Sequence, residues 1–301
     1  MKQRAKKRSD FSQRLLYWLI MALGVVVRNI SRKHSTAIAH LLGDFVYHIL
    51  KTRRELVTKN LALTFPTKSS EEMSAIAVQV YRNQAENIIE MLRLPMIKTA
   101  EDAAKILDID ATALLAQTAG KKKGGIFLTA HFGNWELFGL CSGFLVAPLT
   151  LVVKPLKNRQ IDKQINQWRT MSGNRILYDW QALRQGLRAL QSGGIVVLLG
   201  DQSDRNGSFF TEFLGRRTSV FLGPAWLALK ADVPLFAGIC RRTGEGRYKV
   251  EYEEIAMEDL GTTKADAEEL ARRYTKVLEH SIYRYPEEWF WLHNRWKRME
   301  L

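Results

Sequence analysis

A short apolar stretch that follows two glycines and ends in polar residues places the strongest constraint on the fold of this chain. Residues 126–130 are apolar, and His131 stands where the run ends. Such a run predicts a buried strand. Gly133 and Asn134 then supply turn chemistry and a good helix N-cap before the apolar segment 135–145. We therefore expect His131 on a strand-to-helix turn at the carboxyl edge of a sheet, where open α/β sheets bind their ligands.

The rest of the chain alternates strand-like and helix-like segments, which predicts an α/β fold with a mixed central sheet flanked by helices. Strands are expected at 149–155, 193–202, 233–240 and 248–255. Helices are expected at 34–59, 70–93, 100–119, 158–171, 182–190, 223–230 and 263–285, and residues 209–215 look irregular. We expect residues 31–301 to form a single α/β domain, because no repeat or low-complexity linker divides them.

The N-terminus combines a basic end with an uncharged core. Five cations stand within residues 1–10, and residues 15–27 carry no charge. This core is about 20 Å long as a helix, shorter than the ~30 Å hydrocarbon layer. We expect residues 1–30 to form a membrane-anchor helix, spanning or interfacial, with the main body cytoplasmic. A signal peptide is disfavoured because no small-x-small cleavage site clearly follows. A buried helix of the globular body remains the alternative.

The strongly basic balance of the chain, with a formal charge of +14, predicts an anionic partner. Nucleic acid is disfavoured, because the sequence has no zinc-finger spacing, RNP-like stretch or basic helix. An anionic membrane surface or an acidic protein fits better. Cys141 and Cys240 lie in apolar surroundings without a CxxC pattern, which suits packed thiols in a reducing compartment. We expect no metal site, since no zinc-type spacing of Cys and His occurs.

His131 and Glu136 have the spacing of a general base and its carboxylate partner. A neutral imidazole takes a proton from an attacking hydroxyl, and a carboxylate on the other ring nitrogen fixes the tautomer. The spacing alone is weak evidence, because a chain with 6 His and 31 acids produces such a pair by chance. The alternative is a surface histidine beside a carboxylate that interacts with the helix dipole.

Four motifs together closely resemble the bacterial lipid A late (secondary) acyltransferases, the lauroyl and myristoyl transferases of the lysophospholipid acyltransferase superfamily. They stand in the family's order along the chain and are His131-Phe132-Gly133-Asn134-Trp135-Glu136, Asp201-Gln202, Phe213-Leu214-Gly215 and the tail from Pro286 to Lys297. The resemblance implies an acyltransferase-like fold. It also implies transfer of a fatty acyl chain to a hydroxyl of a lipid A precursor at the cytoplasmic face of the bacterial inner membrane.

The same resemblance implies the partners of the reaction. The acyl donor would be acyl carrier protein or acyl-CoA, the acceptor an anionic glycolipid, and no cofactor would be needed. The related mycobacterial mannoside acyltransferases share the His-x4-Glu form, so another glycolipid or a lysophospholipid is an alternative acceptor. Hydrolysis of the thioester and a catalytically silent membrane lipid-binding protein are further alternatives. Direct transfer is favoured over an acyl-enzyme, because no G-x-S-x-G nucleophile context occurs.

Further candidate residues follow from the chemistry and the resemblance. A tetrahedral oxyanion needs donors, for which backbone N–H groups after Gly133 and an arginine are candidates. The resemblance points to Arg169 for this arginine, with Arg159 as the reserve. The other candidates for substrate binding are Asn134, Lys154, Asp201 and Gln202. Lys154 stands where relatives would carry arginine, so it keeps the charge without the bidentate fork, and Asp201 and Gln202 alternatively cap a turn.

The aromatic tail and the segment Phe213-Leu214-Gly215 complete the sequence predictions. Trp289, Trp291 and Trp296, with the cations at 295, 297 and 298, suit a membrane interface, and a structural role is the alternative. Phe213 and Gly215 are expected to shape the acyl pocket or simply to pack.

Overall fold

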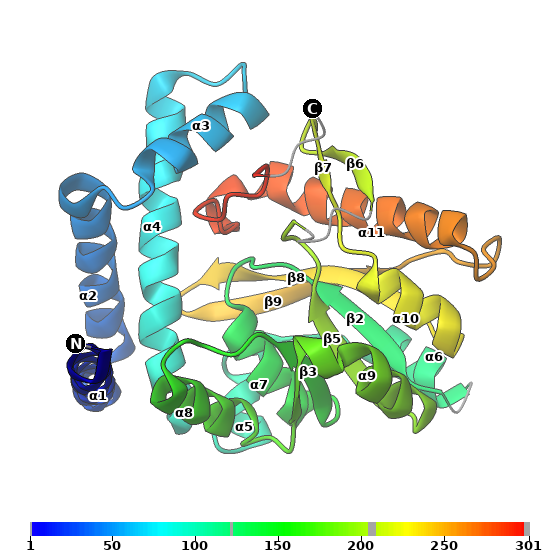
Figure 1. Ribbon diagram of the computed structural model, residues 1–301, viewed down its shortest axis with the longest axis horizontal. Coiled ribbons are helices and arrows are strands. Elements are labelled where there is room, and N and C mark those ends of the chain that lie inside the picture. The colour runs from blue at the N-terminus through cyan, green and yellow to red at the C-terminus, as the bar shows by residue number, and fades with distance from the viewer. Residues whose placement is uncertain (1, 121–122, 204–208, 298–301) are drawn as a thin grey trace.

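A seven-stranded sheet runs through the centre of the molecule in the computed structural model, which describes residues 2–120, 123–203 and 209–297 (Figure 1). The strand order is β1-β9-β8-β2-β5-β3-β4, and neighbours run parallel except for β8 and β9. The strands are β1 (Leu107–Asp108), β2 (Gly125–Thr129), β3 (Leu149–Val153), β4 (Arg175–Tyr178), β5 (Ile195–Leu199), β8 (Leu235–Gly244) and β9 (Arg247–Glu254). This arrangement confirms the predicted α/β class.

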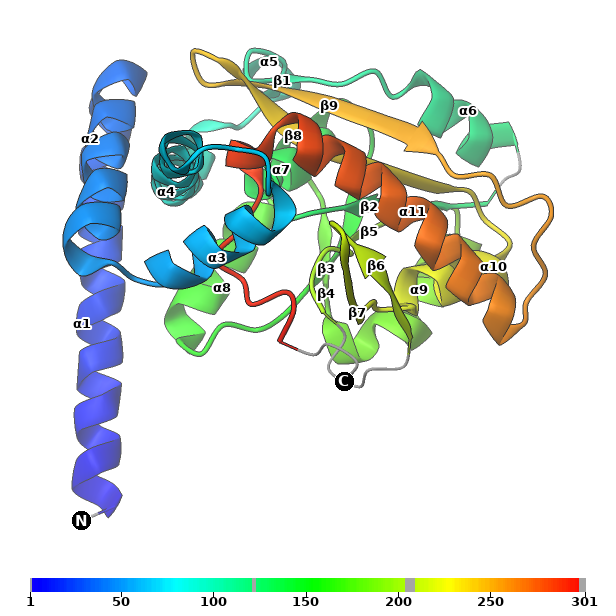
Figure 2. The same ribbon diagram turned by 90° about the horizontal axis from the view of Figure 1, so that it is seen from above.

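Helices cover both faces of the sheet and its carboxyl edge (Figures 1 and 2). They are α1 (Lys2–Arg28), α2 (Arg32–Phe45), the π-helix η1 (Val46–Leu50), α3 (Arg54–Thr64), α4 (Ser70–Arg93), η2 (Leu94–Met96), α5 (Ala100–Ala104), α6 (Thr112–Gly120), α7 (Trp135–Leu145), α8 (Arg159–Arg169), η3 (Asp179–Gln181), α9 (Ala182–Gln191), α10 (Gly223–Ala231), α11 (Lys264–Arg284) and η4 (Pro286–Glu288). A separate two-stranded hairpin joins β6 (Phe210–Phe213) to β7 (Arg216–Ser219).

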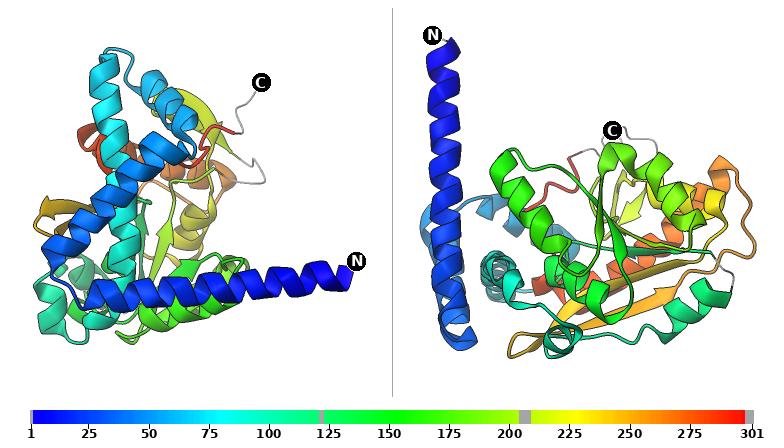
Figure 3. Two further views of the ribbon diagram at one scale, coloured as in Figure 1. Left: turned by 90° about the vertical axis from the view of Figure 1, so that its left-hand side faces the viewer. Right: turned by 90° about the horizontal axis from the view of Figure 1, so that it is seen from below.

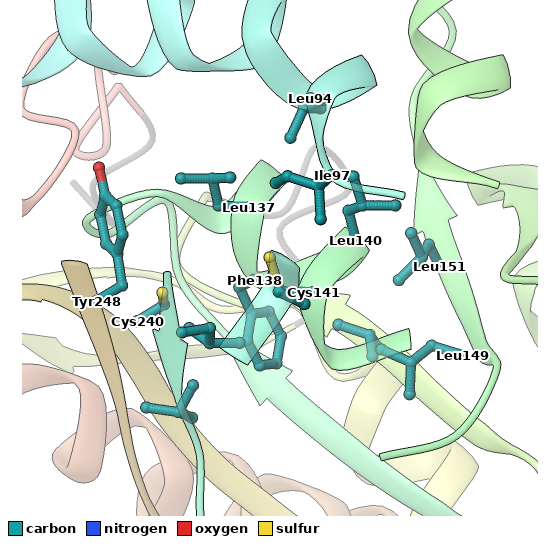
Figure 4. Packing of buried hydrophobic residues seen from close by; sticks show 14 of the residues in the cluster. Leu94, Ile97, Leu137, Phe138, Leu140, Cys141, Leu149, Leu151, Cys240 and Tyr248 are labelled. Carbon is teal, nitrogen blue, oxygen red and sulfur yellow. The ribbon is translucent and has the colours of Figure 1, made fainter. Parts of the chain in front are cut away.

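The alternation of apolar side chains along β2 builds two cores. Phe127 points to the face covered by α7 and the end of α4, where Phe138 and Cys141 pack (Figure 4). Ile126 and Leu128 point to the other face, against α9, α10 and α11. Successive side chains of a strand point to opposite faces, so a strand with helices on both sides is apolar throughout. The glycine-bounded run therefore folds as the buried strand that its composition predicts.

Three predicted segments differ from the structure. Residues 34–59 form α2, η1 and α3 instead of one helix, because Lys51 and Arg53 adopt left-handed backbone angles that interrupt it. Residues 100–119 are divided among α5, β1 and α6, and residues 209–215 lie largely in the β6–β7 hairpin rather than in an irregular loop. Only glycine visits the left-handed region routinely, so neither lysine nor arginine signals such a break in a sequence.

The N-terminal helix α1 lies against the body with one side and leaves the other side open. Its stretch Phe11–Arg28 is apolar and long enough to cross a membrane by length and composition, and 11% of that stretch is buried. Val27 is fully buried, whereas Trp18 is 65% exposed. The alternative of a helix buried in the globular body therefore holds for the inner side of α1 only.

Candidate active site

The register of two parallel strands brings His131 and Asp201 together. Thr129 at the end of β2 pairs with Leu199 at the end of β5, and Gly200 continues the ladder by donating its N–H to the carbonyl of Thr129 at 2.9 Å. Beyond this pair both segments leave the sheet. His131 and Asp201, each two residues past the paired position, therefore meet at the carboxyl edge. The expectation that His131 lies at this edge is confirmed.

The imidazole of His131 is held by a buried carboxylate. Its Nδ1 lies 2.8 Å from Oδ1 of Asp201, and the side chain of Asp201 is only 3% exposed. The second oxygen, Oδ2, accepts a hydrogen bond of 2.9 Å from Nε1 of Trp289. Burial acts to raise the pKa of Asp201, but His131 and Trp289 outweigh it and lower the pKa to about 2. Asp201 therefore stays ionised, with one donor on each oxygen.

A tight turn carries the chain from His131 into helix α7. Gly133 has a φ of +53°, and a Cβ there would stand 1.7 Å from the carbonyl oxygen of Cys240. Only glycine fits such a close approach in this backbone conformation. The N–H of Gly133 donates to the carbonyl of Glu288, and the N–H of Phe290 donates to the carbonyl of His131, both at 3.0 Å. The C-terminal segment is thus bound along the turn like an added strand.

The carboxylate of Glu136 has a different partner from the one that the spacing predicts. Nε and Nη2 of Arg169 donate to its two oxygens at 2.8 and 2.6 Å. Burial acts to lower the pKa of Arg169, but the Glu136 carboxylate outweighs it and raises the pKa. The prediction that Glu136 fixes the His131 tautomer is therefore wrong in this geometry, since Asp201 occupies that ring nitrogen. Glu136 lies in the first turn of α7, where it faces the last turn of α8.

Comparison with known proteins identifies the family. A model of the bacterial lipid A biosynthesis acyltransferase family matches residues 2–298. The chain belongs to this family. It is 25% identical to the lipid A biosynthesis palmitoleoyltransferase of Escherichia coli (strain K12), over 85% of this chain and 82% of that protein. It is also 25% identical to the lauroyltransferase of the same strain, over 85% and 83% of the two chains.

A third relative acts on another lipid by its name. The phosphatidylinositol mannoside acyltransferase of Mycolicibacterium smegmatis (strain ATCC 700084 / mc(2)155) is 24% identical over 69% of this chain and 67% of that protein. These relatives are all named acyltransferases, and the protein is an acyltransferase.

In this acyltransferase, Asn134 is the N-cap of α7. Its Oδ1 accepts hydrogen bonds from the N–H groups of Glu136 and Leu137, as predicted for a cap. Its Nδ2 donates to Oε2 of the buried Glu90 at 2.8 Å. The cap therefore engages two of the helix-start N–H groups that were candidates for the oxyanion. Those two donors are not available for substrate in this conformation.

Of the remaining predicted binding residues, Gln202 lies beside the ring of His131, whereas Lys154 and Arg159 lie on the surface. The amide Nε2 of Gln202 lies 3.4 Å from both ring nitrogens of His131. Lys154 and Arg159 are exposed, and among the described residues neither forms a hydrogen bond with His131 or Glu136. Arg159 instead lines a surface groove of about 770 Å³ between α8 and η3.

Sequence reasoning missed the role of the aromatic tail in this site. Trp289, Trp291 and Trp296 are 1%, 0% and 6% exposed, so the membrane-interface prediction for them is wrong and the structural alternative holds. Arg295 is buried too, and donates to Thr218 Oγ1 and the carbonyl of Ser219. Phe213 packs edge-on against Trp289. Position 298 lies outside the described residues.

A second imidazole lies near the pair. Burial is the main cause that lowers the pKa of His293 to about 4, and Asp201, His131 and Lys154 lie close enough to influence it. Its Nδ1 is buried without a hydrogen-bond partner among the described residues. A neutral ring fits this setting, because burial disfavours the charged form. Within residues 2–120, 123–203 and 209–297, no group of three His, Cys, Asp or Glu side chains is arranged to hold a metal ion.

Proposed function

We propose that the protein transfers a fatty acyl chain from acyl carrier protein to a hydroxyl of a lipid A precursor, with His131 as the general base. The observation that carries this proposal is the hydrogen bond between His131 Nδ1 and the buried carboxylate of Asp201. Membership of the lipid A biosynthesis acyltransferase family supports the reaction class. The names of two relatives and the basic charge of the chain support the choice of acceptor.

The reaction moves one proton in two steps, first from the acceptor hydroxyl to His131 and then from His131 to the leaving thiolate. With Nδ1–H directed at Asp201, the Nε2 atom of His131 takes the proton of the acceptor hydroxyl. The hydroxyl oxygen then bonds to the thioester carbonyl carbon and forms a tetrahedral oxyanion. When the oxyanion collapses, the carbon–sulfur bond breaks, and His131 returns its proton to the leaving thiolate. Asp201 remains ionised throughout and stabilises the imidazolium, because its pKa of about 2 lies far below the working pH.

Other residues have supporting roles in this proposal. Glu136 acts as a positioning residue that holds Arg169 beside the turn, and the Arg169 guanidinium stabilises the oxyanion electrostatically. The Gln202 amide binds the acceptor hydroxyl beside the ring. Lys154 and Arg159 contribute positive charge for the anionic groups of the substrates. No cofactor takes part, and the acyl donor brings its own activated thioester.

We further propose that the protein works at the cytoplasmic face of the bacterial inner membrane. The apolar side of α1 supports attachment to a bilayer, and the formal charge of +14 suits an acidic carrier protein and anionic lipids. A different glycolipid acceptor is the second candidate. It is favoured by the similarity to a protein named as a phosphatidylinositol mannoside acyltransferase.

An in vitro transfer assay tests the proposal. The full chain is mixed with acyl carrier proteins that bear chains of several lengths and with a Kdo-modified tetraacyl lipid A precursor, and the products are identified by mass spectrometry. We expect one acyl mass to be added by the native protein and none by His131→Ala, which removes the proposed base. Circular dichroism and the melting temperature check that the variant folds.

Each other outcome identifies an alternative. Consumption of thioester without an acylated product, while free fatty acid accumulates, would indicate hydrolysis. Transfer only to a mannolipid or a lysophospholipid would replace the acceptor. Absence of thioester consumption would favour a silent lipid-binding protein, and full activity of His131→Ala would refute the proposed mechanism.

A further inference from the structure

Most of the large apolar side chains that the described part of the chain exposes are gathered on its first two helices and on η1. They are Phe11, Leu15, Leu16, Trp18, Leu19, Val25 and Val26 on α1, and Leu41, Leu42, Phe45, Ile49 and Leu50 on α2 and η1. Soluble monomeric proteins rarely expose continuous apolar surface on this scale. The sequence predicts an apolar anchor at residues 1–30 only, so the second half of this surface needs its own explanation.

Helix α2 has two different faces. Its inner face consists of the small residues Ser35, Ala39 and Gly43, all buried. Gly43 allows close approach to α4, because a Cβ there would stand 2.7 Å from the main chain of Arg82. The outer face has large apolar residues at helical spacing, among which Leu41 is 70% exposed. Helix α2 already packs against the protein through its inner face, on α4. The exposed apolar residues of its outer face therefore belong to a second, separate surface.

The charges of α2 lie where they do not interrupt its outer face. The single acid of the helix, Asp44, accepts two hydrogen bonds from Arg82 on α4, at 2.7 and 2.8 Å. Exposed cations stand at the two ends of the α2–η1 segment, at Lys33 and Lys51. An apolar face bordered by cations is the pattern of a helix that lies in the headgroup region of an anionic bilayer.

The outer faces of α1 and α2 belong to one side of the molecule. Both helices pack on α4 and lie on the side of the body that the left view of Figure 3 presents. The inner side of α1 is fixed to the body, where Asn158 Nδ2 donates to the carbonyl of Gln13 at 2.8 Å and Arg93 donates to the carbonyl of Val27. In this conformation α1 therefore offers lipid its outer side, next to α2.

We propose that α2 and η1 form a second membrane-contacting element, so that the protein rests on an anionic bilayer through the joint apolar face of α1, α2 and η1. The inference deepens the proposed function, since a glycolipid acceptor requires contact with a bilayer, but its test does not depend on catalysis. An α2 embedded at headgroup depth would fix the orientation of α4, which carries Arg82, and hence of the site that α4 borders.

Fluorescent labelling of introduced surface cysteines in the full chain tests this inference. The native Cys141 and Cys240 are 0% and 1% exposed, so a thiol-reactive fluorophore reports an introduced surface cysteine. Leu41→Cys and Ile49→Cys place the label on the outer face of α2 and η1. Leu115→Cys is the matched control on α6, at the opposite end of the molecule (Figure 1). Each protein is reconstituted into vesicles of phosphatidylethanolamine and phosphatidylglycerol that contain lipids spin-labelled near the headgroup.

We expect the labels at positions 41 and 49 to be quenched several-fold more strongly than the label at position 115, with blue-shifted emission. Quenching of a Trp18→Cys label without quenching at 41 and 49 would overturn the inference and leave α1 as the sole anchor. Disulfide cross-linking between the Leu41→Cys positions of two copies would also overturn it, because a second copy of the chain would then cover this face. Quenching by lipid together with failure of the transfer assay would support the inference and reject the proposed function alone.

Discussion

At the scale of single residues, the carboxylate of Asp201 joins two parts of the chain that lie far apart in the sequence, at His131 and at Trp289. It accepts one hydrogen bond from the ring of His131 and one from the indole of Trp289. Both donors are present only when the C-terminal segment lies along the turn after β2. A buried carboxylate with two charge-assisted hydrogen bonds is strongly fixed in position, so Trp289 of the C-terminal segment helps to hold the carboxylate that orients the ring of His131.

The substitution Asp201→Asn tests whether Asp201 orients the ring of His131, because asparagine has nearly the same size and shape but a different set of hydrogen-bonding groups. The asparagine amide cannot accept from both donors, so one contact is lost. If its NH₂ group faces His131, the ring must carry its proton on Nε2 and cannot act as a base. We expect kcat to fall by roughly 10²- to 10⁴-fold with little change in KM, measured by acyl transfer under saturating donor.

The matched control for Asp201→Asn is Glu136→Gln, which removes the charge next to Arg169 and leaves the pair of His131 and Asp201 intact. We expect a smaller loss of kcat in this variant. The proposed roles would be exchanged if Glu136→Gln lost more kcat than Asp201→Asn at equal stability.

Glu288 gives the protein a specific dependence of stability on pH. Burial is the largest cause that raises its pKa, which reaches about 7 against 4.5 for the free side chain, although Arg242 opposes the shift. Between these two values the folded state binds more protons than the unfolded state. The free energy of unfolding should therefore fall as the pH rises from 4.5 to 7, by up to about 3 kcal/mol from this group.

Denaturant unfolding at a series of pH values tests this prediction. Glu288→Gln keeps an oxygen that accepts from the N–H of Arg242 but does not titrate. The variant should therefore lose the decline between pH 4.5 and 7. An unchanged slope in the variant would assign the pH dependence to other groups.

At the scale of elements, the start of α7 depends on Asn134 for more than a cap. Asparagine and aspartate are about equally good N-caps, but here Nδ2 also donates to the buried carboxylate of Glu90. Asn134→Asp would keep the cap and bring two carboxylates together. We expect it to lower the free energy of unfolding by about 1–3 kcal/mol, as measured by urea unfolding.

Asn158→Asp is the matched control for the cap of α7. Asn158 caps α8, and its Nδ2 donates to a main-chain carbonyl at Gln13 rather than to a carboxylate. This substitution loses a hydrogen bond without placing two buried charges together, so its cost should be smaller. An equal loss in the free energy of unfolding of the two variants would mean that the contact with Glu90 adds nothing to the effect of Asn134→Asp.

The helices and strands are largely predictable from the sequence where neighbouring residues alone determine them. The apolar runs at β2 and β5 fold as strands, and Asn134 caps its helix, because burial and capping depend on neighbouring residues. The break at Lys51 and Arg53 was not predictable, since nothing in those side chains favours a left-handed backbone. Tertiary contacts decide such positions.

At the scale of the whole molecule, the candidate site shows which information a sequence lacks. His131 and Asp201 could each be selected from the chain as site residues, but their pairing depends on the alignment of β2 with β5, which is a property of the assembled sheet. The spacing to Glu136 offers a nearer carboxylate, and Arg169 from α8 engages it instead. The indole of Trp289 completes the arrangement from the far end of the chain.

The net charge of the whole chain predicts how the reaction depends on salt. With a formal charge of +14, encounter with an acidic carrier protein should be accelerated electrostatically and screened by ions. We expect kcat/KM for acyl carrier protein donors to fall about tenfold between roughly 0.05 and 0.5 M salt, in an assay with the acceptor in neutral detergent micelles. An acyl-pantetheine donor without charge is the control, and its kcat/KM should stay nearly constant. An equal decline with both donors would place the salt effect on the acceptor, because the acceptor is the charged substrate that the two assays share.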